Sequence, residues 1–139
     1  MNFYQTKANK LSGSNYIEVL ESAEIIFKQI KSKTKRKPYL RSAYFNKQKI
    51  FFDYFWIHLR QKRAKERYER LKYFSCAVDL IKNSRIVPIT KQNPNNKNEI
   101  LHRFYGQTKN KERFAVQIKE DKKTNKKDFM SCFSWERDN

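Results

Sequence analysis

The sequence has little of what many catalytic and structural frameworks require. Its 139 residues include only two cysteines, two histidines and two glycines. Two cysteines are too few for a disulfide scaffold, and with two histidines beside them they show no spacing of zinc ligands. With Gly13 and Gly106 alone, the chain also lacks a glycine-rich phosphate-binding loop. We therefore expect no metal and no cofactor, and we expect Cys76 and Cys132 to be small buried side chains.

Long apolar runs are missing as well. Nothing in the sequence approaches the ~18 consecutive apolar residues of a membrane-spanning helix. The N-terminal stretch MNFYQTKANK has no apolar segment of the kind found in a signal peptide. We therefore expect a cytoplasmic protein that has no membrane partner.

Positive charge is what the sequence has in excess. Lysine and arginine total 32 against 14 aspartates and glutamates, which gives a net charge of +18 and a pI near 10. Such a charge concentrates polyanions near the protein and opposes self-association. Nucleic acid is the first partner to consider, and an anionic membrane surface or an acidic protein is the alternative.

The chain length predicts a single domain over residues 1–139. Only 38% of the residues are hydrophobic, but 15% are aromatic, and each buried aromatic side chain removes roughly 150 to 250 Å² from water. The aromatic residues can therefore fill a core. Two parts are expected, a mainly helical one over residues 16–83 and a β-sheet over residues 99–134.

About three helices are predicted in the N-terminal part. Asn15 and Glu18 resemble a capping box, and apolar residues then recur at helical spacing, which indicates a first helix over residues 16–31. A basic stretch containing Pro38 follows, either as a solvated linker or as an RNA-contacting arm. Ser42 is the expected N-cap of a second, aromatic-rich helix.

The third predicted helix begins in the charged stretch LRQKRAKERYERLKYF and continues to about Asn83. Its inner stripe is apolar, and its basic residues are denser than solubility requires. Arg63 and Arg67 are candidates for phosphate contacts, and the alternative is an ordinary solvated helix face. His58 lies in the second helix, where we expect a packed or partly exposed histidine rather than a catalytic one.

The last third of the chain predicts an antiparallel β-meander of three to four strands. Its strand-like segments are EILHRFYGQT, ERFAVQIKED and DFMSCFS, with a short edge strand before them. A turn of two or four residues between the first two segments makes His102 the partner of Gln117. That register places His102, Phe104, Gln117 and Lys119 on an open face. Arg103 then lies among apolar residues unless a bulge turns it round.

This predicted face has side chains that metal-independent RNA cleavage requires. Attack of a ribose 2′-hydroxyl on the adjacent phosphorus needs groups that move protons and cations that offset the charge on the phosphoryl oxygens. His102 is the expected proton-transfer residue, because histidine titrates near neutral pH. Arg103 and Lys119 are expected to stabilise the phosphate, and Gln117 to orient it.

Other side chains near this face are expected to hold the RNA. Phe104 and Tyr105 are candidates for stacking on a base, as single-stranded RNA commonly requires. Arg113, Lys122 and Lys123 are candidates for contacts with the phosphate backbone. The alternative is a sheet whose polar side is simply hydrated.

The segment LHRFYGQTKNKERFAVQIKEDKKTNKKDFMSCF resembles the C-terminal sheet of the phage-associated nucleases grouped with barnase, EndoU, the tRNA-cleaving colicins and the RelE toxins, the BECR group. The shared pattern is His-Arg-Phe on one strand, Gln-x-Lys on the next and a small polar residue on the last. It matches His102 with Arg103, Gln117 with Lys119, and Ser131. The chain lacks the second histidine of the EndoU proteins and a clearly placed glutamate, so it is closer to members that rely on lysine and arginine.

The resemblance implies an α+β fold in which about three N-terminal helices pack on one face of a C-terminal antiparallel meander. It implies a metal-independent endoribonuclease, with Ser131 as a further site residue, and a setting in phage, mobile elements or toxin–antitoxin systems. An acidic antitoxin or immunity protein would suit the basic surface. Two alternatives stay open, a non-catalytic RNA- or ribosome-binding protein and an interaction module for an acidic protein partner.

Overall fold

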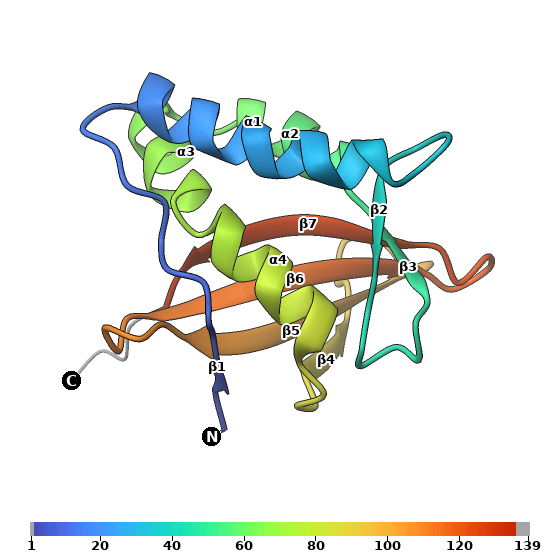
Figure 1. Cartoon of the computed structure of the whole chain (residues 1–139). Coiled ribbons are helices and arrows are strands. Elements are labelled where there is room, and N and C mark those ends of the chain that lie inside the picture. Colours follow the sequence, from blue (N-terminus) through green and yellow to red (C-terminus); the bar gives the residue numbers. More distant parts are fainter. Residues whose placement is uncertain (1, 136–139) are drawn as a thin grey trace.

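The structure, a computed structural model, describes residues 2–135 and consists of a β-sheet with helices packed against it (Figure 1). The elements follow in the order β1 (Tyr4–Gln5), α1 (Tyr16–Ser32), β2 (Tyr39–Arg41), β3 (Lys49–Phe51), α2 (Asp53–Arg60), α3 (Ala64–Leu71), α4 (Phe74–Asn83), β4 (Ile89–Gln92), β5 (Glu99–Gln107), β6 (Arg113–Asp121) and β7 (Lys127–Ser134). Within residues 2–135 no helix is long and apolar enough to cross a bilayer.

The sheet has seven strands of mixed orientation. Its order is β1-β5-β6-β7-β3-β2, and β4 pairs with β5 outside this path. The central strands β5, β6 and β7 are antiparallel, whereas β1 runs parallel to β5 and β3 runs parallel to β7. Figure 1 shows the sheet curled into a half-barrel, with α4 in front of it and α1, α2 and α3 above β7.

The predicted fold class, about three N-terminal helices on an antiparallel meander of three to four strands, is wrong. The described residues form four helices and a seven-stranded mixed sheet, and β1, β2 and β3 come from the part of the chain expected to be mainly helical. The sheet is mixed because β1 and β3 pair in parallel with β5 and β7, on opposite sides of the antiparallel C-terminal strands. The helices are therefore interleaved with strands along the chain.

The largest local difference concerns the aromatic-rich segment after Pro38. Ser42 starts no helix, although its hydroxyl accepts a hydrogen bond from the Phe45 N–H as an N-cap would, because the chain turns at once in the tight loop that joins β2 to β3. Asn46 and Lys47 in this loop have φ angles of 54° and 68°, which a right-handed helix does not contain. The helix of this region is confined to the eight residues of α2.

The third predicted helix is divided into α3 and α4, which meet at Lys72 and Tyr73 (Figure 1). The break lets Leu71 at the end of α3 be buried together with Tyr73 and Phe74 at the start of α4. One straight helix would turn part of this cluster to solvent, because successive side chains are about 100° apart around a helix axis. Core packing therefore decides the break.

The first predicted helix is confirmed as α1. Asn15 is its N-cap, and the Asn15 side chain accepts the Glu18 N–H at 3.0 Å. The Glu18 carboxylate accepts from the N–H and hydroxyl of Ser14 rather than from the N-cap itself. The Asn15 side chain therefore caps the helix as the sequence predicts. The Glu18 carboxylate differs from that of a regular capping box because it binds the residue before the N-cap.

One carboxylate fastens the N-terminal segment to α4. Asp79 accepts hydrogen bonds from the backbone N–H groups of Lys7 and Ala8, from the Tyr4 hydroxyl and from the Asn83 amide. Burial of this carboxylate favours its protonated form, but the hydrogen bonds together hold the pKa of Asp79 below its usual value. Asp79 thereby keeps β1 beside β5.

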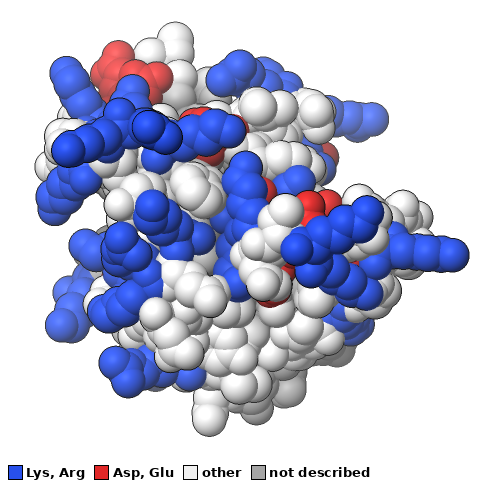
Figure 2. Space-filling view, turned by 90° about the vertical axis from the view of Figure 1, so that its right-hand side faces the viewer, with Lys and Arg blue, Asp and Glu red and all other residues white. Residues whose placement is uncertain are grey.

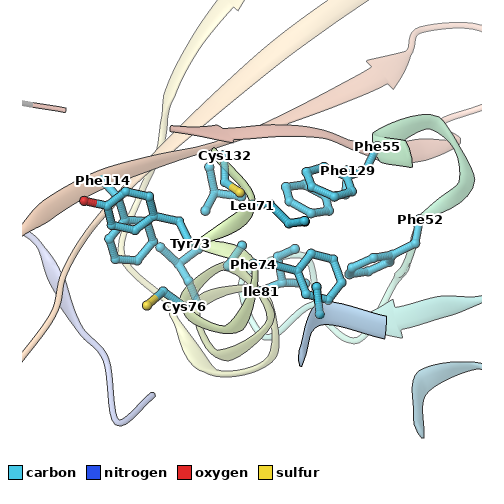
Figure 3. Close-up of a cluster of buried hydrophobic side chains, with 14 of the residues drawn as sticks. Phe52, Phe55, Leu71, Tyr73, Phe74, Cys76, Ile81, Phe114, Phe129 and Cys132 are labelled. Atoms are coloured by element: carbon cyan, nitrogen blue, oxygen red, sulfur yellow. The ribbon is translucent and has the colours of Figure 1, made fainter. Parts of the chain in front are cut away.

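Aromatic side chains form the core, as the composition predicts (Figure 3). Phe55 of α2 stacks on Phe129 of β7, with ring centroids 4.5 Å apart and an interplanar angle of 5°. Phe52 and Phe74 complete this cluster with edge-on contacts. Both cysteines are free and buried, and burial raises the pKa of the Cys76 thiol to about 11.

The pairing of β5 with β6 differs from the predicted register by one residue. The connecting loop has five residues, 108–112, instead of two or four. The odd length makes Arg103, and not His102, the partner of Gln117, and it turns every β5 side chain to the other face. The predicted facing of β5 is therefore wrong, whereas that of β6 is confirmed, because Gln117 and Lys119 lie opposite the face that α4 covers.

Gly106 allows this register without a bulge. It pairs directly with Phe114, and a Cβ at Gly106 would lie 2.4 Å from the Phe114 Cζ. The aromatic ring thus occupies the space that any other residue would fill.

The bulge of the sheet lies in β7. Ser131 pairs with Gln117, but the next residue of β6, Ile118, pairs with Phe129, so Met130 is an extra residue. The bulge places Phe129 in the core and turns Phe133 toward the opposite face. Phe129 is therefore fully buried, whereas Phe133 is partly exposed.

Candidate functional site

Seven polar or charged side chains meet on the face of the sheet that α4 does not cover. They come from α2, α3, β5, β6 and β7. We call this set the open-face site: Tyr54, His58, Arg70, Arg103, Gln117, Lys119 and Ser131.

The helix α2 reaches this face because β3 is short. β3 pairs with β7 through only its last two residues, so the rest of this edge of β7 is free for α2 to pack against. Phe55 and Leu59 of α2 point into the core. Tyr54 and His58, each one residue earlier, share the neighbouring side of the helix, because residues four apart are neighbours on a helix surface.

Arg103 and Gln117 form a cross-strand pair. The Gln117 Oε1 accepts hydrogen bonds from Arg103 Nε at 3.2 Å and from Arg103 Nη2 at 2.9 Å. The Gln117 amide nitrogen contacts the Met130 sulfur at 3.5 Å. Within residues 2–135 the Arg103 Nη1 has no hydrogen-bond partner, so this half-buried guanidinium keeps donors for an anion.

Arg70 of α3 approaches the same surface from the other side. Its Nη1 donates to the Ser131 Oγ at 2.6 Å, and its Nη2 lies 3.6 Å from Glu66 Oε2. The guanidinium carbons of Arg70 and Arg103 lie 5.3 and 5.2 Å from the centre of the Phe133 ring. One outward-facing ring therefore contacts both guanidinium groups.

Lys119 joins α2 to the sheet. Its Nζ lies 3.8 Å from the centre of the Tyr54 ring and 3.8 Å from Glu99 Oε2. Tyr54 in turn stacks on His58, with ring centroids 5.8 Å apart and planes 17° from parallel. The ammonium group and the imidazole thus flank one tyrosine ring.

The environment of His58 keeps its imidazole neutral near pH 7. Burial lowers the pKa of His58 from its usual value of about 6.5, and the positive charges of Lys62, Arg70 and Lys119 lower it further. A neutral imidazole is able to accept a proton. The site therefore combines a proton acceptor with several cations.

His102 lies on the opposite, core-facing side and is 7% exposed. Its Nδ1 is 2.8 Å from Thr90 Oγ1, and its Nε2 is 2.8 Å from Glu120 Oε1. Lys127 Nζ is 3.7 Å from the same carboxylate oxygen and donates to Gln48 Oε1 at 2.6 Å. The prediction that His102 lies on the open face is wrong, because the five-residue loop reverses β5.

The structure thus brings together four of the five predicted catalytic residues, Arg103, Gln117, Lys119 and Ser131, and leaves His102 out. The predicted base-stacking residues also separate. Phe104 is 3% exposed, which excludes it from a surface stack. Tyr105 lies on the open face beside Arg103.

The predicted RNA-binding residues do not form one surface. Arg113 lies on the outward side of β6, whereas Lys122 and Lys123 are exposed in the turn between β6 and β7. Arg63 is exposed just before α3, and Arg67 packs against an aromatic ring of α1. Figure 1 places α3 and the β6–β7 turn at opposite ends of the molecule.

A second basic surface, which we call the hairpin groove, lies between the β2–β3 loop and the β6–β7 turn. It is a cavity of about 430 Å³ whose exposed cations are Arg41, Lys47, Lys49 and Lys126. Figure 2 looks onto this end of the molecule and shows many lysines and arginines with few acidic residues between them. The groove is suited to phosphate contacts that carry no catalytic role.

Sequence reasoning did not select Tyr54, His58 or Arg70. His58 was assigned to packing because Trp56 and Leu59 surround it in the sequence. The spacing of Tyr54 and His58 could have indicated a polar side of this helix, but no sequence signal shows that β3 is short enough to let α2 reach the open face.

Among residues 2–135, no three His, Cys, Asp or Glu side chains are grouped as metal ligands would be. Comparison of the chain with models of known families, with curated proteins and with solved structures found no match. The resemblance to the BECR nucleases stays a prediction from the sequence.

Proposed function

We propose that the protein is a metal-independent endoribonuclease that cleaves RNA at the open-face site. The observation that carries the proposal is the convergence of His58, Arg70, Arg103 and Lys119 on one half-buried surface. The cations Arg70, Arg103 and Lys119 repel one another, and among residues 2–135 carboxylates lie near only two of them, Glu66 at 3.6 Å from Arg70 and Glu99 at 3.8 Å from Lys119, so a further anion is favoured at this surface. In a protein with a net charge of +18, the phosphate of RNA is an anion that the field concentrates.

The site has a group for the main demands of cleavage by 2′-hydroxyl attack. Neutral His58 accepts the proton of the 2′-hydroxyl as its oxygen bonds to phosphorus. Arg70 and Arg103 bind the non-bridging oxygens, and Lys119 stabilises the 5′-oxygen, which takes a proton from water as its bond to phosphorus breaks. The His58 imidazolium then returns its proton to water. The products are a 2′,3′-cyclic phosphate and a 5′-hydroxyl, and no metal takes part in these steps.

Gln117 and Ser131 are positioning residues in this scheme. Gln117 holds the guanidinium of Arg103, and Ser131 holds that of Arg70. Both hydrogen bonds fix side chains that would otherwise lose conformational freedom when RNA binds. An acidic inhibitor, which the sequence resemblance implies, would suit the same cations and would exclude RNA by occupying the site.

The second candidate function is non-catalytic binding of RNA or ribosomes. It is favoured by the presence of a single imidazole in the site, because acid–base cleavage usually uses one group to take a proton and another to give one. The two functions differ in what His58 does. A binder loses affinity when cations are removed and is indifferent to a neutral histidine.

The test is incubation of the purified protein with total RNA in EDTA, followed by mapping of new 5′ ends and analysis of the 3′ ends. We expect 2′,3′-cyclic phosphate ends from the parent and a loss of roughly 100- to 1,000-fold in rate for Arg103→Ala and Lys119→Ala. The matched controls are Arg36→Ala and Lys37→Ala, which remove the same charges from the exposed linker before β2.

The controls should retain most of the cleavage rate. If the parent leaves total RNA intact but binds it, the second candidate function replaces the first. If the site variants cleave as well as the linker variants, the open-face site is not the active site.

A further inference from the structure

We propose that a cavity beside Arg103 is a subsite for one nucleobase of single-stranded RNA, an inference that rests on the proposed function of the open-face site. The cavity has a volume of about 180 Å³ and lies between β4 and β5 on the open face. Its apolar walls include Ile89, Leu101 and Tyr105, and the paired side chains of Arg103 and Gln117 form its polar end.

The size of the cavity favours a single ring system. Cavities for drug-sized ligands usually measure about 300–1,000 Å³. A volume of about 180 Å³ is therefore small for a cofactor or a peptide segment. A nucleobase has apolar faces and a polar edge, and proteins bind unpaired bases by stacking on the faces and hydrogen bonding to the edge. The cavity offers this combination.

The Tyr105 ring is fixed in place before any ligand binds. It contacts Phe3 edge-on, with ring centroids 6.3 Å apart, and Trp135 with centroids 5.1 Å apart. A ring held on two sides loses little conformational freedom when a base stacks on it. Tyr105 is therefore a preorganised wall of the cavity.

The polar end of the cavity supplies hydrogen-bond donors. Arg103 Nη1 has no partner within residues 2–135, and the Gln117 amide nitrogen makes only a weak contact with sulfur there. Lys91 adds an exposed ammonium group at the rim. These donors favour a base that presents carbonyl oxygens, such as uracil.

The subsite is continuous with the proposed site of cleavage. Arg103 lines the cavity and also lies beside the Phe133 ring with Arg70. A base in the cavity would therefore leave its own phosphate next to both guanidinium groups. This continuity explains how a shallow sheet surface can hold a flexible single strand in register for attack.

Binding of uncleavable chains separates the subsite from the chemistry. The probes are a tetramer of 2′-deoxyuridine and the same chain with abasic sites, because neither has a 2′-hydroxyl that could attack. The parent should bind the base-bearing tetramer roughly 5- to 150-fold more tightly than the abasic one, the range expected for one stacked base. Tyr105→Leu and Ile89→Ser should reduce this ratio toward one.

The matched control is Ile25→Ser on α1. Ile25 and Ile89 are both exposed, at 64% and 43%, so the two substitutions carry similar risks to folding. Ile25→Ser should keep the ratio of the parent. Equal affinity of the parent for both tetramers overturns the subsite and leaves the proposed cleavage site standing. An equal fall of the ratio in both serine variants also overturns it, and failure to bind either tetramer contradicts the proposed function together with the subsite.

Discussion

His58 and His102 lie on opposite faces of the sheet, so the same substitution should affect them in opposite ways. His58→Gln removes the proposed proton acceptor and should lower the cleavage rate by roughly 100- to 10,000-fold. Its affinity for RNA should change little, because glutamine is as neutral as His58 at pH 7. Single-turnover rates and equilibrium binding on the same RNA measure the two effects.

His102→Gln is the matched control. It weakens the buried contacts with Thr90 and Glu120 and should lower the free energy of unfolding by about 1–3 kcal/mol. Its cleavage rate per folded molecule should stay near that of the parent. The opposite pattern, with turnover lost in His102→Gln and kept in His58→Gln, would place the active site on the core-facing side, around His102 and Glu120.

The cleavage rate should depend on pH through His58. The pKa of this imidazole is lowered, by burial first and then by its cationic neighbours. The neutral form therefore persists below the usual pKa of about 6.5, and the rate should stay level from about pH 8 to pH 7 and fall only at lower pH. The same His58 opposes folding at low pH, because the unfolded chain takes up the proton more readily. A cleavage rate that increases from pH 7 to pH 5 would contradict His58 as the base.

Gly106 is required because of the ring beside it. Gly106→Ala places a methyl group where Phe114 lies and should lower the free energy of unfolding by about 1–3 kcal/mol. Phe114→Leu in the same chain makes room, so the double variant should lose less than the sum of the two single variants. Urea unfolding of the four proteins measures the coupling, and strictly additive losses would show that the contact is not the cause.

At the scale of the elements, the N-terminal strand depends on Asp79. Asp79→Asn should release β1 from α4 and lower the free energy of unfolding by about 1–3 kcal/mol, because a charged acceptor of several hydrogen bonds is lost. The lowered pKa means that Asp79 stabilises the fold at neutral pH and that this contribution is lost as the pH falls through the acid range.

Hydrogen exchange at Gln5 and Thr6, compared between parent and Asp79→Asn, measures the release directly. Asp53→Asn is the control, since it removes a similar charge from the first turn of α2. Unchanged protection of the N-terminal segment in Asp79→Asn would show that strand pairing alone holds it.

The sequence predicted the elements whose signals are local. Helix α1 was predicted almost to the residue because Asn15 and the apolar repeat both lie within it, and β5, β6 and β7 were predicted from their alternation. The two-residue β1 and the three-residue β2 and β3 were missed. β1 and β3 pair with β5 and β7, which are far along the chain, whereas β2 pairs with the nearby β3. Strands so short have no period of their own.

The candidate site was partly predictable for the same reason. Arg103, Gln117 and Lys119 were selected from strand patterns and Ser131 from the resemblance, yet the facing of Arg103 depended on whether the loop at 108–112 has an even or an odd number of residues. Composition does not determine that number, because Lys111 supplies a left-handed φ of 62° without being glycine. His58 of α2 is far from these four residues in the sequence, and only the folded structure brings it beside them.

For the whole molecule, net charge should dominate affinity for RNA. Contacts with six phosphates would give a slope of roughly −4 in the logarithm of affinity against the logarithm of salt concentration on single strands. Charge removed from the hairpin groove, as in Lys47→Ala with Lys49→Ala, should reduce this slope by up to about 1.4 and leave the cleavage rate at saturating RNA unchanged. A titration series in KCl tests both, and an affinity that does not vary with salt rules out phosphate binding as the source of affinity.

The parallel pairing of β1 with β5 has a consequence for how the chain assembles. Tyr4 pairs with Gly106, so a loop of roughly 100 residues must close before this contact forms. Topologies with such distant pairings fold slowly. During synthesis α1 to α4 emerge before there is any C-terminal sheet for them to cover, and the hydrogen bond from Arg70 to Ser131 cannot form until β7 has been made. Under the proposed function, a ribosome translating this message meets no active nuclease on the nascent chain until β7 has left the exit tunnel.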